Sequence, residues 1–566
     1  MKPIRPLLVL CICSAALVSS CHRDWRTYQH DSFRTSNQFF GGSLRDASKV
    51  GTLHVVWSWH PGLVGDPDVD PQMQVGFSAS PVVADDMVFV GHLNGYMYAI
   101  TRSGTLAWKF PCPATPRPLA GCPGPATGPA KPLTSVGGIY NAYYNPSSPG
   151  IASTAAVIRR VQGKTAVIFG APDPSSNSGD GRVWAVDEKS GAQIWASPVV
   201  AERTKNEQIS YDSPLVLGNR VYIGIASYGD NPLVPGKLLS LDLQTGIQVP
   251  SFSFFSVKDC AGNSGCGLLV PKEGGSIWSS PAATPKNALV ITTGNPCTRG
   301  TNPQCNKEPA ENHAPSMLQL DAASGVPSWE FHPVPWANDN DDDWASTPAI
   351  LNSSCGPVAI SHPKDGFVHA IAVDKTGPQV GQAVRLWTYP DTTFDGGTGN
   401  EYTLRPPAVW SEGGNDVAFT IAGGLDIITN PNGGTHRLYA LNVCGGNRVR
   451  WWIETETKRP DGTPSAFGAA SVTHGIVYIG DDAGVLHVFA DTSIRHSNKF
   501  HCEYPPATVG GIIDYELCVL LGWGQTEIPV ELATVGLKGG TYTAPALVPG
   551  RVYVTTRAGL VYALEP

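Results

Sequence analysis

Charged residues and long apolar segments are both scarce in this sequence. Only 15% of its 566 residues are charged, and 47 acidic residues outnumber 39 basic ones, which gives a formal net charge of −8. Such a chain lacks the positive charge that binds phosphate backbones, so we expect no nucleic-acid partner. After residue 20, no segment is long and apolar enough to predict a transmembrane helix.

Two cysteine motifs are also missing. The sequence has no Cys-x-x-Cys-His segment, which excludes a covalently attached c-type haem. The spacing of its 13 cysteines is poor for zinc ligands. Disulfides are therefore the expected use of most of these cysteines.

The first 20 residues have the features of a lipoprotein signal peptide. Lys2 and Arg5 form a basic start, and residues 6–18 are apolar but too few to span a bilayer as a mature anchor. Residues 18–21, Val-Ser-Ser-Cys, resemble a bacterial lipobox, in which Cys21 would be lipidated and become the mature N-terminus. An ordinary signal peptide that is cleaved nearby is the alternative.

The signal peptide predicts a location in the bacterial cell envelope, facing the periplasm and anchored by lipid. Residues 21–50 would be a tether before the folded domain. His22 stands where an aspartate is linked with retention in the inner membrane, so the sequence favours the outer membrane. Removal of Lys2 and Arg5 makes the mature net charge 37 − 47 = −10.

Ten cysteines remain after the signal peptide and Cys21, and an even number in an exported chain indicates disulfides. The sequence leaves their connectivity open. Pairing of near neighbours would join Cys112 with Cys122, Cys260 with Cys266, Cys297 with Cys305 and Cys502 with Cys518, leaving Cys355 with Cys444.

One pattern recurs eight times along the chain. It consists of an apolar strand, a turn, a second apolar strand, a short glycine turn and often a tryptophan. The copies occupy residues 87–110, 181–197, 236–252, 316–331, 366–390, 436–454, 476–493 and 551–566. Repeats of alternating strands predict an all-β, eight-bladed β-propeller over residues 51–566. The strand at 51–59 would complete the last blade and remove its exposed edge.

The tryptophans of the repeat have a structural explanation, since they would pack between neighbouring blades. They are Trp57, Trp108, Trp195, Trp329 and Trp387. The third and seventh blades, predicted at 209–252 and 466–493, lack this tryptophan.

Four polar or aromatic residues fall at equivalent places in consecutive repeats. In a propeller, loops that enter the first strand and loops that leave the second strand lie at the same end of the ring. Trp278 precedes a first strand, whereas Asp230, Asn295 and Lys364 each follow a second strand. Their convergence predicts a site near the axis.

These residues also carry a family resemblance. The repeats resemble pyrroloquinoline-quinone (PQQ) repeats, and residues 274–376 resemble the core of quinoprotein alcohol dehydrogenases, including the polyvinyl-alcohol type. The shared features, in order, are a tryptophan in "GGSIWSSP", the "TGN" turn and the "PKDG" turn. The resemblance implies an eight-bladed fold, a bound PQQ and a Ca²⁺ ion.

The resemblance assigns a role to each of the four residues. Trp278 would be the floor on which the quinone stacks, and Lys364 would contact a quinone oxygen. Asn295 and Asp230 would ligate Ca²⁺, for which oxygen ligands are suited. The structural alternatives are a core tryptophan, a turn asparagine and a surface lysine.

The catalytic base is where the sequence departs from the family. The family places an aspartate shortly before the strand that here reads "SMLQLD", and Glu311 is the acid that this chain offers. A glutamate can accept an alcohol proton, although it reaches one methylene further. The disulfide between adjacent cysteines found in several such dehydrogenases is absent.

Two functional hypotheses follow. The first is PQQ- and calcium-dependent oxidation of a small or polymeric alcohol, in which hydride passes to the quinone. Because the haem motif is absent, electrons would leave to a separate cytochrome or a membrane quinone. The alternative is a non-catalytic propeller lipoprotein that acts as a binding or outer-membrane assembly scaffold, similar to the assembly lipoprotein built from the same repeats.

Overall fold

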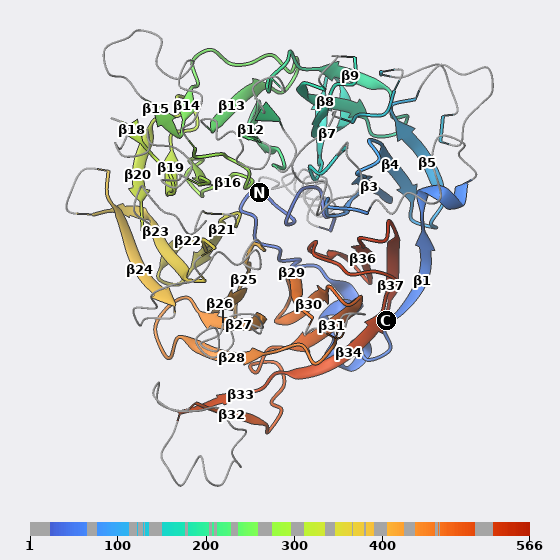
Figure 1. Ribbon diagram of the computed structural model, residues 1–566. Helices are drawn as coiled ribbons and strands as arrows, with labels where there is room; N and C mark the ends of the chain where they lie inside the picture. The colour runs from blue at the N-terminus through green and yellow to red at the C-terminus, as the bar shows by residue number, and fades with distance from the viewer. Residues whose placement is uncertain are drawn as a thin grey trace, which may run out of the picture.

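Each sequence repeat folds into an antiparallel sheet, because its alternating apolar strands are separated by tight turns. In the computed structural model, eight such sheets stand around a central axis, and the chain runs once around the ring (Figure 1). The structure describes residues 23–566 except 65–75, 113–120, 123–127, 130, 135–149, 176–178, 203–206, 209–211, 228–235, 259–273, 296–310, 334–343, 345, 365, 378–380, 390–404, 424–435, 459–461, 463–464 and 504–523.

The first four sheets, blades A to D, follow one another along the chain. Blade A contains β2 (Val82–Ala84), β3 (Met87–Gly91), β4 (Met97–Thr101) and β5 (Leu106–Phe110). Blade B contains β6 (Ala156–Val161), β7 (Lys164–Pro172), β8 (Gly181–Asp187) and β9 (Gln193–Ala196). Blade C contains β10 (Glu207–Gln208), β11 (Leu215–Leu217), β12 (Arg220–Ser227), β13 (Lys237–Asp242) and β14 (Phe254–Phe255). Blade D contains β16 (Ala282–Ala283), β17 (Leu289–Thr292), β19 (Met317–Leu320) and β20 (Pro327–Phe331).

Blades E to H complete the ring. Blade E contains β21 (Ala349–Ser353), β22 (Gly356–Ser361), β23 (Val368–Thr376) and β24 (Ala383–Tyr389). Blade F contains β25 (Ala408–Glu412), β26 (Asn415–Gly423), β27 (His436–Asn442) and β28 (Val449–Ile453). Blade G contains β29 (Phe467–Thr473), β30 (Ile476–Asp481), β31 (Val485–Ala490) and β34 (Val530–Gly536). Blade H contains β35 (Ala546–Val548), β36 (Arg551–Thr555), β37 (Val561–Glu565) and β1 (His54–Trp59).

The remaining elements are short. β15 (Val257–Lys258) pairs with β18 (Glu311–Asn312), and β32 (Phe500–Glu503) pairs with β33 (Gly524–Glu527) in a hairpin that projects from the ring (Figure 1). The helical turns are η1 (Gly42–Arg45), α2 (Ala47–Val50) and η2 (Pro61–Val64). Among the described residues, none of the helices has the length and hydropathy required to cross a membrane.

The N-terminal strand closes the ring as predicted. β1 pairs antiparallel with β37, from His54 opposite Glu565 to Trp59 opposite Val561, and Figure 1 shows the two strands side by side. This pairing makes the last blade from both ends of the domain and removes an exposed sheet edge.

The predicted range of blade G, 466–493, ends too early. Its outer strand is β34, which pairs with β31 after an insertion that carries the β32–β33 hairpin. Blade C also extends beyond its predicted range of 209–252, because its outer strand is β14. Both outer strands lack the tryptophan by which the other repeats were aligned.

The described core consists of clusters that each join neighbouring blades. The buried residues of blades A and B form one cluster, those of B and C another, and the same holds around the ring. Tryptophan indoles add a directional contact, since Trp108 donates to the carbonyl of Glu188 in the next blade and Trp195 to that of Leu243. Trp57, Trp329 and Trp387 donate in the same way to Arg102, Val373 and Val443. The predicted packing of these tryptophans between blades is confirmed.

Blade C replaces the missing tryptophan with a tyrosine. The Tyr222 hydroxyl donates to the carbonyl of Ala322 in blade D at 2.7 Å, and Arg220 donates to the same carbonyl at 3.0 Å. A polar contact between blades is therefore kept where the sequence pattern is lost.

Hydroxyl groups also join the blades near the axis. In blades A to D, the amide that enters the first strand donates to a hydroxyl of the next blade over distances of 2.9–3.0 Å. The series is Ser80 to Thr154, Thr154 to Ser213, Ser213 to Ser280 and Ser280 to Thr347. We call it the hydroxyl girdle, and it aligns the first strands of blades A to E at one level.

Residues 25–38 lie inside the ring, along the inner edges of the first strands. Carbonyls of this axial segment accept from inner-strand amides, as Ser32 does from Ala283 and Thr35 from Val409. Further backbone bonds reach blades A, B, E and G, and the Gln38 side chain donates to the Leu547 carbonyl of blade H. These bonds pair edge groups of the inner strands that would otherwise be buried without a partner. The described part of the expected tether is thus packed within the domain.

Arg34 stands at the centre of this segment and is completely buried. Its guanidinium donates to the carbonyls of Pro281 at 2.9 Å and of Ser213 and Pro214 at 3.3 Å, and also to Thr27 and Tyr28 of its own segment. One side chain therefore connects the axial segment to blades C and D.

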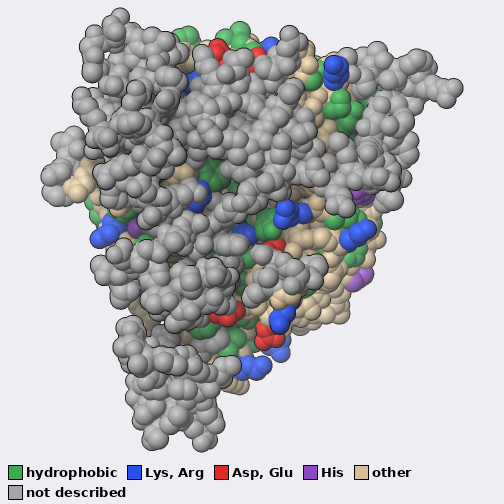
Figure 2. Space-filling model, viewed as in Figure 1, with side chains coloured by type: hydrophobic (Ala, Val, Ile, Leu, Met, Phe, Trp, Pro, Cys, Tyr) green, Lys and Arg blue, Asp and Glu red, His purple; other side chains and the backbone are tan. Residues whose placement is uncertain are grey.

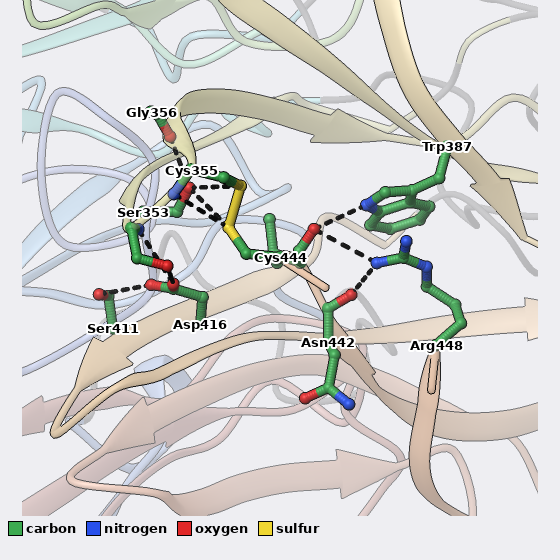
Figure 3. The surroundings of a disulfide bond; sticks show 11 residues. Ser353, Cys355, Gly356, Trp387, Ser411, Asp416, Asn442, Cys444 and Arg448 are labelled. Atoms are coloured by element: carbon green, nitrogen blue, oxygen red, sulfur yellow. Dashed lines mark hydrogen bonds between the residues drawn. A yellow bond between two sulfur atoms is a disulfide. The ribbon is translucent and has the colours of Figure 1, made fainter. Parts of the chain in front are cut away.

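The predicted disulfides Cys112–Cys122 and Cys355–Cys444 are both present. The second joins a turn of blade E to a turn of blade F (Figure 3). Beside it, Trp387 donates to the Val443 carbonyl and packs against the Arg448 guanidinium, 4.2 Å from the ring centroid. The sulfur atoms of the other predicted pairs, Cys260–Cys266, Cys297–Cys305 and Cys502–Cys518, lie outside the described residues.

Replacement of Arg34 by methionine is expected to lower the free energy of unfolding by about 3–5 kcal/mol, because buried carbonyls of Ser213, Pro214 and Pro281 lose their donor. Denaturant unfolding followed by tryptophan fluorescence measures this change. Arg102→Met is the control, since Arg102 pairs with Asp86 on the surface and such pairs contribute about 0–1 kcal/mol. Equal midpoints for the two variants would contradict the role of Arg34.

Replacement of both Cys355 and Cys444 by serine is expected to cost about 2–5 kcal/mol, because the unfolded chain regains the freedom of a long loop. The Cys112/Cys122 double variant is the control. Its cysteines are 10 residues apart, whereas Cys355 and Cys444 are 89 residues apart, so its cost should be smaller. The same thermal or denaturant experiment compares the two, and a larger loss from the 112–122 pair would refute the expectation.

Candidate functional site

Trp278 and Lys364 come from neighbouring blades and meet on one end of the ring. Trp278 lies just before β16 of blade D, and Lys364 follows β22 of blade E. The Lys364 ammonium lies 5.4 Å from the centroid of the Trp278 ring, within the range of a cation–π contact. Both side chains are half-buried. The structure thus brings together two of the predicted site residues.

Asn295 lies beside the loop that leads to Trp278. Its carbonyl accepts from the Gly275 amide at 2.6 Å, and the Gly294 amide donates to the Ser276 carbonyl at 2.7 Å. Gly275 has φ +88°, and an added Cβ would stand 2.4 Å from the Ser256 hydroxyl, so only glycine fits there. Two backbone bonds therefore fix the TGN turn against the tryptophan loop.

The other two predicted residues are described only in part or not at all. Asp230 lies outside the described residues. The backbone of Glu311 belongs to β18 and is opposite Lys258, but its side chain is outside the described part. Their roles remain predictions.

The loop that follows Glu311 is fastened to the TGN turn. The Thr293 hydroxyl accepts from the Ser316 amide at 2.8 Å and donates to the His313 carbonyl at 2.6 Å. The His313 ring contacts Glu330 at 2.9 Å, and the Ser316 hydroxyl donates to Glu330 at 2.6 Å. Burial opposes ionisation of Glu330, but these contacts lower its pKa overall.

Three further residues occupy equivalent places in blades F and H and were missed from the sequence. Arg405 precedes the first strand of F, Tyr542 precedes the first strand of H, and Arg557 follows the second strand of H. The guanidinium carbons of Arg405 and Arg557 lie 5.0 and 5.1 Å from the Tyr542 ring centroid. The repeat register that selected Trp278 and Lys364 would have selected them, but no family motif marks them.

Blade G places a histidine between two acids near the same end. The His487 ring contacts Glu531 at 2.7 Å through Nδ1 and Asp481, the last residue of β30, at 3.3 Å through Nε2. Burial alone would lower the pKa of His487, but the hydrogen bonds with both acids raise it above the ordinary value. Burial likewise opposes ionisation of Asp481, whose pKa is lowered overall by its bonds to His487 and Thr457.

A buried acid lies directly behind the tryptophan loop. Asp212 accepts from the Gly224 amide, and a Cβ at Gly224 would stand 2.4 Å from the carbonyl of Ile277, the residue before Trp278. Burial raises the pKa of Asp212 to about 8, against the lowering effects of the Gly224 amide and Arg34. The loop that carries Trp278 thus rests on a packed interior.

Basic and acidic side chains both show near the middle of the ring face drawn in Figure 2. Among the described residues, no group of three or more His, Cys, Asp or Glu side chains is arranged to hold a metal ion. A calcium site at Asn295 would need oxygen atoms from outside these residue types or outside the described part.

Three solved structures resemble this chain over nearly its whole length. A quinohaemoprotein alcohol dehydrogenase from Comamonas testosteroni has a TM-score of 0.62 and 17% sequence identity, covering 98% of this chain and 84% of that chain. A second one, from Pseudomonas putida HK5, has a TM-score of 0.62 and 15% identity, covering 97% and 81%. A europium-containing methanol dehydrogenase has a TM-score of 0.61 and 14% identity, covering 98% and 100%.

Comparison by sequence gives no relative. No protein-family model matches the chain, and no curated protein matches it. The structural likeness shows the fold, and the chain is an eight-bladed propeller of the kind found in quinoprotein alcohol dehydrogenases, as its repeats predicted.

The His487 cluster predicts a pH-dependent contribution to stability. A pKa raised in the folded state stabilises the protein fully below the ordinary value of 6.5, and the contribution is lost as pH rises through the folded value. His487→Gln is therefore expected to lower the free energy of unfolding by about 1–3 kcal/mol near pH 5, and by less in alkaline solution. Denaturant unfolding at several pH values measures the difference. His496→Gln, which removes a largely exposed imidazole, is the control. A loss of unfolding free energy in the His487 variant that grows as the pH rises would exclude this explanation.

Proposed function

We propose that this protein oxidises an alcohol with the help of PQQ and Ca²⁺. The observation that carries the proposal is the position of the Lys364 ammonium over the Trp278 ring, beside a TGN turn that is bonded to the tryptophan loop. The fold, which resembles known quinoprotein dehydrogenases, supports the same general kind of protein.

The described residues fit a flat anionic group. The half-buried Trp278 ring offers an apolar surface, and the ammonium above it already contacts that surface through a cation–π interaction. A planar carboxylate-bearing quinone such as PQQ would exchange this contact for stacking on the indole and an ion pair with Lys364. Asn295 would offer an amide oxygen to Ca²⁺, and Asp230 a carboxylate.

The residues of the chain would then have distinct tasks. When bound, PQQ supplies the hydride acceptor and Ca²⁺ polarises it. Lys364 would stabilise negative charge as it develops on a quinone oxygen, and Trp278 would hold the ring in place. Glu311 would accept the alcohol proton. Electrons would leave to a separate cytochrome or a membrane quinone.

We further propose that the protein faces the periplasm and is held by lipid on Cys21. Support comes from the basic and apolar start of the sequence and from the two disulfides among the described residues. Disulfides persist in oxidising compartments, and the periplasm is one of them.

Titration of the mature protein with PQQ and Ca²⁺ tests the proposal. The wild type is expected to show bound-quinone absorbance and alcohol-dependent dye reduction. Trp278→Ala should weaken quinone binding about 10- to 100-fold, since stacking on an aromatic ring is worth about 1–3 kcal/mol. Lys364→Gln should lower kcat about 10²- to 10³-fold, because a charge that stabilises the transition state is lost.

Lys286→Gln is the matched control, because Lys286 belongs to the β16–β17 turn at the far end of blade D and pairs there with Asp374. This variant should bind the quinone and oxidise the alcohol as the wild type does. No quinone binding by the wild type would refute the proposal and favour the scaffold function. Binding without turnover of any alcohol would refute the catalytic part.

A further inference from the structure

Two arginines and one tyrosine form a stack on the same end of the ring as Trp278. The Arg405 guanidinium lies over the Tyr542 ring, and the Arg557 guanidinium contacts the same ring and donates to the Tyr542 hydroxyl at 3.0 Å. Arg405 is only 7% exposed, whereas Arg557 is exposed. A buried and an exposed cation therefore share one aromatic partner.

Contacts connect this stack to the Trp278–Lys364 pair. His362, two residues before Lys364, contacts the Arg405 carbonyl at 2.9 Å through Nε2. Burial lowers the pKa of His362 to about 4, so its ring is neutral at pH 7 and adds no charge. Trp278, Lys364, His362 and Arg405 thus lie along one arc over blades D, E and F.

Two glycines of blade G leave room for the loop of blade H that carries Tyr542. Gly468 and Gly480 have no side chains, and a Cβ at Gly480 would stand 1.9 Å from the Thr541 methyl group, while one at Gly468 would stand 3.1 Å from the Tyr542 backbone. The loop with Tyr542 therefore crosses close over blade G. Tyr542 comes within reach of Arg405 only because this space is empty.

Three basic side chains lie along the arc of a negatively charged protein. Lys364, Arg405 and Arg557 lie along it, whereas the whole chain has a formal net charge of −8. The nearby acids have donors of their own, since Asp482 accepts from the Ser465 hydroxyl at 2.7 Å and Asp481 contacts His487. Basic side chains at this end of the ring are the groups that can donate charge-assisted hydrogen bonds to an anion.

We propose that Arg405, Tyr542 and Arg557 form a carboxylate-binding subsite. Guanidinium groups bind carboxylates through paired hydrogen bonds, and their contact with Tyr542 holds the planes in a fixed orientation. The substrate class that this subsite implies, an alcohol that carries a carboxylate, rests on the proposed function. The same chemistry would serve a carboxylate of the quinone.

The test titrates the mature protein, first without quinone, with glycolate and with the neutral ethylene glycol, and follows the ligands by NMR. Glycolate is expected to bind at least tenfold more tightly than ethylene glycol. Arg557→Gln should weaken glycolate binding about tenfold or more. Tyr542→Phe, which keeps the ring and removes the hydroxyl, should cause a smaller loss.

Arg551→Gln is the matched control. Arg551 lies over Tyr553, 6.0 Å from its ring centroid, at the opposite end of the same strand β36, so its loss changes net charge equally but away from the subsite. It should leave glycolate binding unchanged. Arg557 is exposed, so its variant tests the subsite without removing buried packing, and the thermal midpoint confirms that it folds.

A second titration with PQQ and Ca²⁺ separates the two sources of the carboxylate. Weaker glycolate binding in Arg557→Gln with unchanged quinone binding assigns the subsite to the substrate. Weaker quinone binding alone supports the subsite and assigns it to the cofactor. If Arg557→Gln binds both as the wild type does, the subsite is refuted, whether or not the protein binds quinone.

Discussion

The structure depends on how the inner edges of eight first strands are satisfied around one axis. Each innermost strand leaves amides and carbonyls that no fifth strand of its own blade can pair, and unpaired buried groups are costly. The axial segment at 25–38 meets this need, and the hydroxyl girdle holds the strands of blades A to E at one level. Arg34 joins the two systems, since it donates to the strand entrances of blades C and D. A guanidinium suits the place because its donors spread in several directions from one planar group.

The candidate site rests on this interior. Pro281, whose carbonyl accepts from Arg34, is three residues after Trp278, and Asp212 supports the strand beside Ile277. The tryptophan loop is therefore fixed from below by the axis and from the side by the Asn295 turn. A side chain on such a support can keep its orientation while its exposed face remains available to a ligand. Lys364 reaches it from blade E, so the position of one blade relative to the next decides whether the ammonium and the indole meet.

The sequence predicted features that repeat and missed those that occur once. The strands, the closing strand β1 and the disulfide at 112–122 were predicted, because the repeat and short turns define them locally. The disulfide at 355–444 was predicted only as the pair left after near neighbours were joined. β34 was missed because an insertion separates it from β31 and its tryptophan is absent. The axial segment has no repeat pattern, since each of its residues meets a different blade. Trp278 and Lys364 were predicted because both the repeat register and the family resemblance mark them. Arg405, Tyr542 and Arg557 were missed because only the repeat register marks them.

Filling of the axis has a consequence for the chemistry of the ring. The axial segment contacts the first strands of all eight blades and includes fully buried residues such as Trp25, Arg34 and Ser36. A ligand on Trp278 would therefore have to arrive and leave on the side that carries the arc of Lys364, Arg405 and Arg557. A charge at an entrance acts on every approaching molecule, including those that are not bound. The same cations that would hold an anion would thus also favour anions among the molecules that reach the tryptophan. In a ring that is open at both ends, an uncharged competitor could enter from the opposite side, and the arc would discriminate less.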